Sequence, residues 1–183
     1  MGKEFIKLFT PLKREKVIKL KAGEKVLITG VIYTARDAAH KKLVRLIKEK
    51  KPLPFLLDDQ IIYYTAPTPP GRGKVIGACG PTTSSRMDKY TPLLLSRGLR
   101  GVMGKGQRSV EVKEAIKKNE AIYFITIGGA GAYLSRRVKK AEIIAFPEIE
   151  PEAIYKLWVE DFPAIVGIDA RGEDLYQNLW RNK

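Results

Sequence analysis

The strongest constraint on the fold is a pattern of strand, glycine-rich turn and helix that occurs three times in succession after residue 73. The predicted strands cover residues 74–78, 101–103 and 121–126, and each runs into a turn that contains glycine. Such alternation favours strands that share one sheet, with the turns at their carboxyl ends and helices packed against the sheet. The sequence therefore predicts an α/β fold with a mixed sheet.

The segments on either side of this pattern add further strands and one long helix. Residues 25–33 are rich in β-branched side chains, and Gly30 among them predicts a bulge or a close backbone approach. Apolar residues recur at helical spacing over residues 37–50, which predicts an amphipathic helix. Shorter strands are predicted at residues 17–20, 61–65, 143–146 and 164–168. Because no linker interrupts the chain, we expect residues 1–183 to form a single domain, with a basic N-terminal arm, residues 1–22, packed on or flanking it.

Composition narrows the class of protein. The 183 residues include 34 Lys and Arg against 20 Asp and Glu, a formal net charge of +14, so an acidic partner or substrate is expected. Cys79 is the only cysteine and His40 the only histidine, which excludes an internal disulfide and any metal site built from several thiolates or imidazoles. No apolar run approaches the roughly 18 residues of a membrane span, so we expect a soluble, cytoplasmic protein that makes no membrane contact.

Cationic and hydroxyl side chains follow the predicted strands at the points where those strands end. They are Arg36 after the strand at residues 25–33, Thr82 and Arg86 in the first glycine-rich turn, and Lys105 and Arg108 in the second, while Gly128 and Gly129 form the third turn. Backbone N–H groups and helix N-termini at such turns favour anions, and a guanidinium fork binds a carboxylate through two hydrogen bonds. The pattern therefore predicts a pocket for a small ligand with two carboxylates.

Each of these residues also has a simpler interpretation. A single arginine in so basic a chain is usually a solvated surface residue, and only the shared position after strands favours a binding role. His40 is predicted to be a structural histidine, with a supporting role in the site as the alternative, and Cys79 to be a packed small residue. The basic face of residues 37–50 is solvated by default, and no RNA-binding signature accompanies it to favour nucleic acid.

The segment Gly80-Pro81-Thr82-Thr83-Ser84-Ser85-Arg86-Met87-Asp88 resembles the β subunit, or C-terminal domain, of class I iron–sulfur fumarate hydratases and the related tartrate dehydratases. Residues 30–40, 104–109, 128–129 and 159–164 resemble further blocks of the same family, in the family's order. The resemblance covers nearly the whole chain, residues 23–179, and implies a single swivelling β/β/α domain.

Members of this family interconvert fumarate and malate at a 4Fe-4S cluster, whose three cysteine ligands belong to the α subunit or N-terminal domain. The resemblance therefore implies that this chain is a β subunit, active only as a hetero-oligomer with an α subunit that carries the cluster. It also implies that Thr82 is the candidate base for the carbon-bound proton. By the same resemblance the dicarboxylate is bound by Arg36, Arg86, Lys105 and Arg108 and by the backbone turns at Gly128 and Gly129.

One turn bears on which acid the family member would use. Fumarase-type turns read Lys-Gly-Asn-Arg-Ser, and this chain has Gln107 in place of the asparagine while keeping Arg108, which tartrate-type chains tend to lose. The resemblance thus favours a fumarate hydratase, with an L-tartrate dehydratase β subunit as the alternative. A non-catalytic basic domain that binds nucleic acid is the alternative from a different class.

Overall fold

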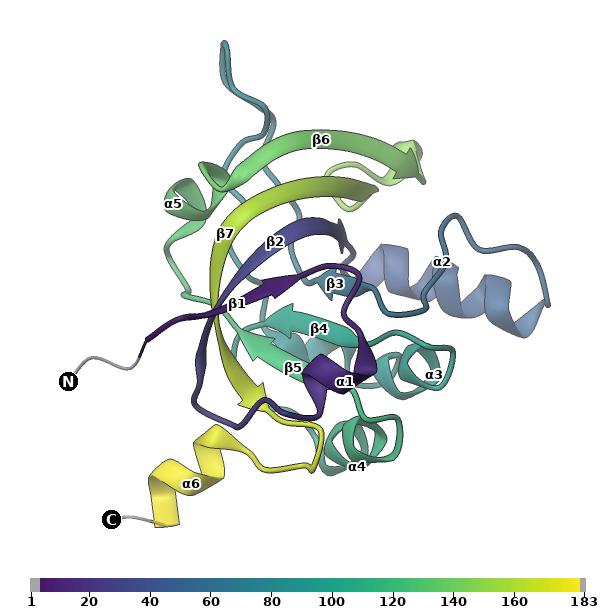
Figure 1. The fold of residues 1–183 in the computed structure, drawn as a ribbon. Helices are drawn as coiled ribbons and strands as arrows, with labels where there is room; N and C mark the ends of the chain where they lie inside the picture. The colour runs from purple at the N-terminus through teal and green to yellow at the C-terminus, as the bar shows by residue number, and fades with distance from the viewer. Residues whose placement is uncertain (1–3, 182–183) are drawn as a thin grey trace.

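Seven strands form one mixed sheet that closes on itself (Figure 1). The computed structural model describes residues 4–181. The strands are β1 (Ile6–Phe9), β2 (Lys25–Thr34), β3 (Ile61–Tyr63), β4 (Gly101–Gly104), β5 (Ile122–Ile125), β6 (Val138–Ala145) and β7 (Ile154–Ile168). Their order is β1-β2-β3-β4-β5-β7-β6, and β2 also pairs with β7. Strands β1 to β5 run parallel, whereas β7 runs antiparallel to β2, β5 and β6, so the predicted mixed sheet is confirmed.

The described residues form six α-helices, of which three cover one side of the parallel strands. The helices are α1 (Arg14–Val17), α2 (Asp37–Lys48), α3 (Thr91–Leu95), α4 (Val110–Lys118), α5 (Gly131–Ser135) and α6 (Leu175–Arg181), with short 3-10 helices η1 (Ser84–Met87) and η2 (Pro147–Ile149). Figure 1 shows α2, α3 and α4 together on the side of β3, β4 and β5, away from β6 and the upper part of β7. Among residues 4–181 there is no helix with the length and apolarity to span a bilayer.

Buried apolar side chains form two clusters, one on each face of the parallel strands. Successive residues at the end of β3 point to opposite faces. Tyr63 therefore joins the cluster enclosed by the strands, with Ile28 and Phe162, whereas Tyr64 joins the cluster under the helices, with Leu43. The result is two layers of strands and one layer of helices, the arrangement that the resemblance implies.

Most of the predicted elements are present, but two predicted strands are wrong. Residues 17–20 form the end of α1 and the turn after it, and β1 is the strand that joins the N-terminal arm to the sheet, by pairing with β2. Residues 74–78 lie in a loop, in which the Ala78 and Gly77 N–H groups donate to the Thr68 hydroxyl and carbonyl oxygens, at 2.8 and 3.1 Å. The apolar pattern there reflects burial of Ile76 in the core and not strand pairing.

Strand β7 is much longer than the predicted segment at residues 164–168. It begins at Ile154 and continues through Asp161, whose φ of 46° is left-handed, and through Pro163. These two residues are poor strand formers, so they hide the first part of the strand in the sequence. The Asp161 N–H donates to the Thr29 hydroxyl at 3.0 Å, which ties the irregular point of β7 to β2.

The predicted irregularity at Gly30 is confirmed in β2. The register with β7 shifts between Ile28 and Gly30, and Gly30 has a φ of +124°. A Cβ at this position would overlap the Thr10 hydroxyl and lie 3.2 Å from the Thr10 carbonyl oxygen. Gly30 therefore satisfies two demands, an unusual backbone conformation and a close approach of the segment after β1.

His40 lies in the buried face of α2. Its Nδ1 is 2.8 Å from the Arg36 carbonyl oxygen and so carries the proton, while Nε2 is buried without a hydrogen-bond partner among the described residues. The ring packs against Tyr64 and Tyr90, with ring centroids 5.2 and 5.9 Å away. Burial lowers the pKa of His40 from 6.5 to about 4, and the charge of Arg108 acts in the same direction.

The Gly30→Ala variant should lose about 3–5 kcal/mol of unfolding free energy, because the new methyl group meets Thr10 in a backbone region that L-residues rarely adopt. Gly73→Ala is the matched control, since its φ is +70° but no atom of the described residues lies within 4 Å of an added Cβ. We expect that control to lose only about 1 kcal/mol. Urea denaturation measures both losses, and equal losses would show that the close approach to Thr10 has no effect.

Stability should fall on acidification because His40 is neutral when folded. Its folded pKa of about 4 lies below the unfolded value of 6.5, so the unfolded chain binds the extra proton between these values and folding weakens as pH falls through this window. Between pH 7 and pH 5 the wild type should lose about 2 kcal/mol more than His40→Gln, which has no titrating ring. Urea melts at the two pH values provide the comparison, and parallel losses in the two proteins would contradict it.

Candidate functional site

Three turns meet at the carboxyl ends of the parallel strands. The Ser84 N–H donates to the Lys105 carbonyl oxygen at 2.9 Å, and the Lys105 N–H donates to the Thr82 carbonyl oxygen at 3.3 Å. The Lys105 side chain runs past the third turn, because a Cβ built on Gly128 would lie 3.4 Å from Lys105 Cδ and 3.8 Å from Nζ. The structure thus brings together the turns that hold Thr82, Lys105 and Gly128.

Glycine at the end of β4 makes this close packing of turns feasible. A Cβ on Gly104 would overlap the Ser84 hydroxyl and lie 3.2 Å from the Thr82 carbonyl oxygen. The Thr82 N–H in turn donates to the Tyr64 carbonyl oxygen at 2.7 Å, just after β3. Half-buried Thr82 is therefore held by the ends of two neighbouring strands.

Arg36 and Arg86 lie near the N-terminus of α2, and each contacts a carboxylate. Arg36 is the residue before α2, and its Nη2 is 3.6 Å from Glu152 Oε1. Arg86 comes from η1, and its Nη2 is 2.7 Å from Asp37 Oδ2, with a second contact of 3.3 Å from Nε to Oδ1. The Glu152 Oε2 atom accepts from the Ala38 N–H at 2.8 Å, so this carboxylate also caps α2.

Arg108 differs from the other cations because its side chain is fully buried. Its Nε donates to Asp88 Oδ1 at 2.7 Å, and its Nη2 donates to the Thr91 hydroxyl at 2.9 Å. The guanidinium also lies over the rings of Tyr64 and Tyr123, 5.3 and 4.9 Å from their centroids. In this conformation Arg108 holds η1, α3 and the start of α4 together from behind the turns.

Sequence reasoning missed the acidic partners of these arginines. Asp37 begins the predicted helix and Asp88 ends the first glycine-rich turn, and neither position indicates in the sequence which arginine it pairs with. Glu152 is more than 110 residues from Arg36 in the chain, so only the pairing of β7 with β2 brings it to α2.

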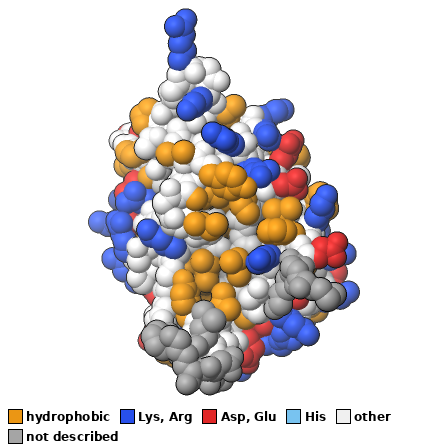
Figure 2. Space-filling model, turned by 90° about the vertical axis from the view of Figure 1, so that its left-hand side faces the viewer, with side chains coloured by type: hydrophobic (Ala, Val, Ile, Leu, Met, Phe, Trp, Pro, Cys, Tyr) orange, Lys and Arg blue, Asp and Glu red, His pale blue; other side chains and the backbone are white. Residues whose placement is uncertain are grey.

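Gly128 and Gly129 are exposed, and the residue before them is apolar. Gly129 has a φ of +78°, which suits a glycine turn. The Ile127 side chain is 61% exposed, and apolar residues from β5 and β7 line a shallow groove of about 210 Å³ that includes Ile127 and Phe5. Figure 2 shows a face on which hydrophobic side chains gather in the centre with lysine and arginine side chains around them.

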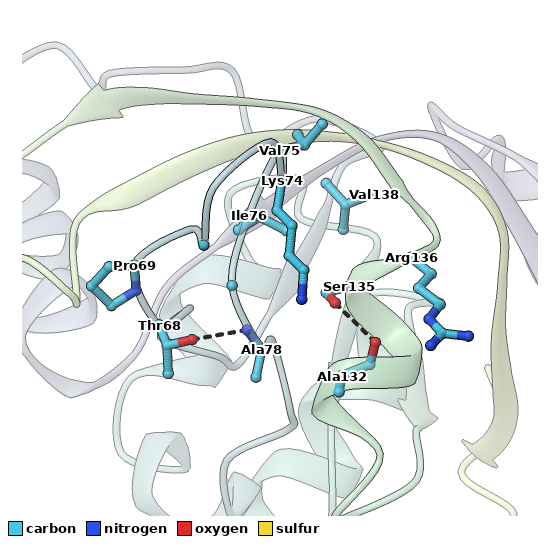
Figure 3. A pocket seen from close by; sticks show the side chains of 12 residues that line it. Thr68, Pro69, Lys74, Val75, Ile76, Ala78, Ala132, Ser135, Arg136 and Val138 are labelled. Carbon is cyan, nitrogen blue, oxygen red and sulfur yellow. Dashed lines mark hydrogen bonds between the residues drawn. The ribbon is translucent and has the colours of Figure 1, made fainter.

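A larger cavity, of about 490 Å³, lies beside the third turn and not over the cations of the candidate site. It lies between the loop at residues 68–78 and α5. Figure 3 shows the Lys74 and Ser135 side chains in the space between this loop and α5, and Arg136 also lines the cavity. None of the seven predicted site residues lines this cavity. Next to its lining residues Ala78 and Ala132, the Cys79 N–H donates to the Gly131 carbonyl oxygen at 3.2 Å.

The residues of this chain do not fit an iron–sulfur cluster. Cys79 is fully buried, and burial raises the pKa of its thiol to about 12, so the thiolate that binds metal is disfavoured. A cluster held by three thiolates needs three cysteines, and the chain has one. Among the described residues no group of three or more His, Cys, Asp or Glu side chains is arranged to hold a metal ion.

Comparison with known proteins identifies relatives over almost all of the chain. A family model described as Fumarase C-terminus matches residues 2–179. The anaerobic class I fumarate hydratase of Escherichia coli (strain K12) is 43% identical over 154 residues, 83% of this chain and 28% of that protein. Fumarate hydratase 2 of Leishmania major is 38% identical over 165 residues, 89% of this chain and 29% of that protein.

A third relative has nearly the same length as this chain. The putative L(+)-tartrate dehydratase subunit beta of Methanocaldococcus jannaschii is 34% identical over 177 residues, 93% of this chain and 91% of that protein. The chain therefore spans less than a third of the two fumarate hydratases and most of the tartrate dehydratase subunit. On the family match and these relatives, the chain belongs to the fumarase C-terminus family of the class I fumarate hydratases and tartrate dehydratases.

Proposed function

We propose that this chain is the β subunit of a two-subunit class I fumarate hydratase, which catalyses the reversible hydration of fumarate to (S)-malate. The observations that support the proposal are that Arg36 and Lys105 follow strands β2 and β4, and that Arg86 pairs with Asp37 at the start of α2, in a chain of this family. A four-carbon dicarboxylate has two anionic ends, and two guanidinium forks and an ammonium match that charge pattern.

The arginines and the lysine would bind and orient the substrate. Arg36 and Arg86 present donors near the N-terminus of α2, whose dipole favours anions. The Lys105 ammonium would bind from the side of the third turn, where the exposed backbone of Gly128 and Gly129 lies within reach. Arg108 would act from behind, through its contacts with Asp88 and Thr91, and would add positive potential without solvent exposure.

Thr82 would handle the proton on carbon, by donating it in hydration and removing it in dehydration. A threonine hydroxyl is a weak base, so this role requires nearby cations that stabilise the alkoxide. Lys105 is the nearest candidate in the fold, because its backbone N–H donates to the Thr82 carbonyl oxygen. The hydroxyl transfer that the family carries out at a 4Fe-4S cluster is assigned to an α subunit, because Cys79 is the only cysteine here. No step of that transfer is assigned to residues of this chain.

L-tartrate dehydration is the second candidate function, and it is favoured by one observation. The relative whose length this chain matches is named a putative L(+)-tartrate dehydratase subunit beta. Tartrate differs from malate by one further hydroxyl group, so the same cations would hold its two carboxylates. The choice between the two acids then depends on groups that meet the extra hydroxyl.

Reconstitution with a partner tests the proposed function directly. This chain is mixed anaerobically with the α-type chain encoded in the same genome, and turnover of fumarate, malate and L-tartrate is assayed for the mixture and for each chain alone. We expect fumarate and malate turnover only in the mixture, because the chain lacks the ligands for a cluster. Preference for tartrate would support the second candidate. Turnover of none of them, together with salt-sensitive binding of nucleic acid, would support the basic-domain alternative.

Lys105→Ala should raise the KM for fumarate in the reconstituted enzyme by about 10-fold or more, since a charge-assisted hydrogen bond contributes roughly 1.5–3 kcal/mol. Lys41→Ala, which removes an exposed lysine from α2, is the control and should leave the KM unchanged. Steady-state kinetics at constant ionic strength make the comparison, because loss of any lysine from this basic chain weakens general attraction of anions. Equal effects of the two substitutions would remove Lys105 from the site.

A further inference from the structure

The guanidinium group of Arg86 is already occupied by a carboxylate of this chain. Its Nη2 and Nε atoms contact the two oxygens of Asp37, at 2.7 and 3.3 Å. The Nε–Oδ1 contact is a hydrogen bond and the Nη2–Oδ2 contact is an ion pair, so the Arg86 fork faces this carboxylate as it would face that of a ligand. A dicarboxylate that uses the Arg86 fork must therefore compete with Asp37.

The two carboxylates near α2 differ in how firmly they are held. The Arg86 and Asp37 side chains are 48% and 34% exposed, and an ion pair so exposed contributes little stability. The Glu152 and Arg36 side chains are less exposed, and the second oxygen of Glu152, Oε2, accepts a hydrogen bond from the Ala38 N–H. Release of Glu152 would uncap α2, whereas release of Asp37 breaks only its contact with Arg86.

The position of Asp37 also favours its release. It is the first residue of α2, a helix of 12 residues, so the positive end of the helix dipole stabilises its charge without Arg86. Its Oδ2 atom is buried and accepts no hydrogen bond among the described residues, so release from Arg86 breaks one hydrogen bond, from Nε to Oδ1, and one ion-pair contact. Exchange of one carboxylate for another on Arg86 therefore costs little on the protein side.

We propose that Asp37 is a placeholder carboxylate, which occupies Arg86 while the site is empty and yields that arginine to a carboxylate of the substrate. The proposal rests on the proposed function, because it takes Arg86 as a substrate-binding residue. Asp37 acts here as a specificity-determining residue: a dianion with a carboxylate placed to reach Arg86 displaces it, and a ligand without one leaves the pair closed. Glu152, by contrast, positions Arg36 in both states.

The placeholder role of Asp37 is tested with the variant Asp37→Asn, in the enzyme reconstituted with the α-type chain. Asparagine has nearly the same shape and no charge, so Arg86 is released from competition. The KM for fumarate should fall about two- to fivefold, the range that corresponds to loss of an exposed ion pair, with kcat changed by less than about twofold. The matched control is Glu49→Gln, which breaks the exposed Arg45–Glu49 pair at the other end of α2 and should leave both constants unchanged.

An unchanged or raised KM in Asp37→Asn would overturn the proposal, since Asp37 would then be inert or would hold Arg86 in its productive place. Asp37→Ser gives the same comparison if the asparagine variant does not assemble. Calorimetric binding of succinate, a dicarboxylate that cannot be hydrated, provides a readout that is independent of turnover. If Asp37→Asn binds succinate more tightly but the wild type turns over neither fumarate nor malate, the placeholder role is supported and the proposed function is rejected. If the wild type is active but the variant shows unaltered succinate binding and KM, the proposed function is supported and the placeholder role is rejected.

Discussion

The antiparallel pairing of β7 with β2 determines where the charged groups of the candidate site lie. Because the two strands run in opposite directions, the beginning of β7 lies beside the end of β2. The Thr34 hydroxyl fixes this junction: it donates to the Ala153 carbonyl oxygen at 3.3 Å and accepts from the Tyr155 N–H at 3.0 Å. Glu152 precedes the junction on one strand and Arg36 follows it on the other, so their contact is a consequence of the strand register.

The same register explains why a one-residue slip would be costly. Alternate residues of β2 and β7 are buried, and a slip would turn the buried side chains outward along both strands. The register shifts once, between Ile28 and Gly30, and is regular from Gly30 to Tyr33, after which the Thr34 hydroxyl holds the start of β7 against the end of β2. The positions of Arg36 and Glu152 at the start of α2 therefore depend on the register between β2 and β7, which is fixed by buried side chains.

Local patterns were sufficient to predict much of the fold, but contacts between distant segments were not. β-branched residues predicted β2, and helical spacing predicted α2, because each pattern is set by residues next to one another in the chain. The segment at residues 74–78 has the same local character as a strand, yet its backbone pairs with Thr68, and only the folded chain determines that choice. Similarly, β7 contains Asp161 and Pro163, and its continuity is imposed by its neighbours β2, β5 and β6.

In the candidate site, too, local patterns were predictable from the sequence and contacts between distant segments were not. Placement of Arg36 and Lys105 after strands could be predicted, since parallel strands bring their carboxyl ends to one edge. Arg86 was expected after a strand at residues 74–78, but it lies in η1 after a loop. Burial of Arg108 could not, because it depends on Asp88, which comes from a different segment and meets Arg108 only in the fold. An arginine in a turn has the same sequence signature whether it faces a ligand or an internal carboxylate.

Charge at the N-terminus of α2 is nearly balanced although the whole chain is strongly basic. Arg36 and Arg86 each face a carboxylate, so the excess of cations at +14 lies mainly elsewhere and would act on an anion at a distance, by steering. At close range the guanidinium of Arg86 is half-exposed, and water weakens its attraction for a carboxylate. A second wall that excludes water would strengthen that attraction severalfold. The exposed Gly128–Gly129 turn and the apolar Ile127 beside it are suited to contact such a wall, which is the physical reason to look for a partner chain over this edge of the sheet.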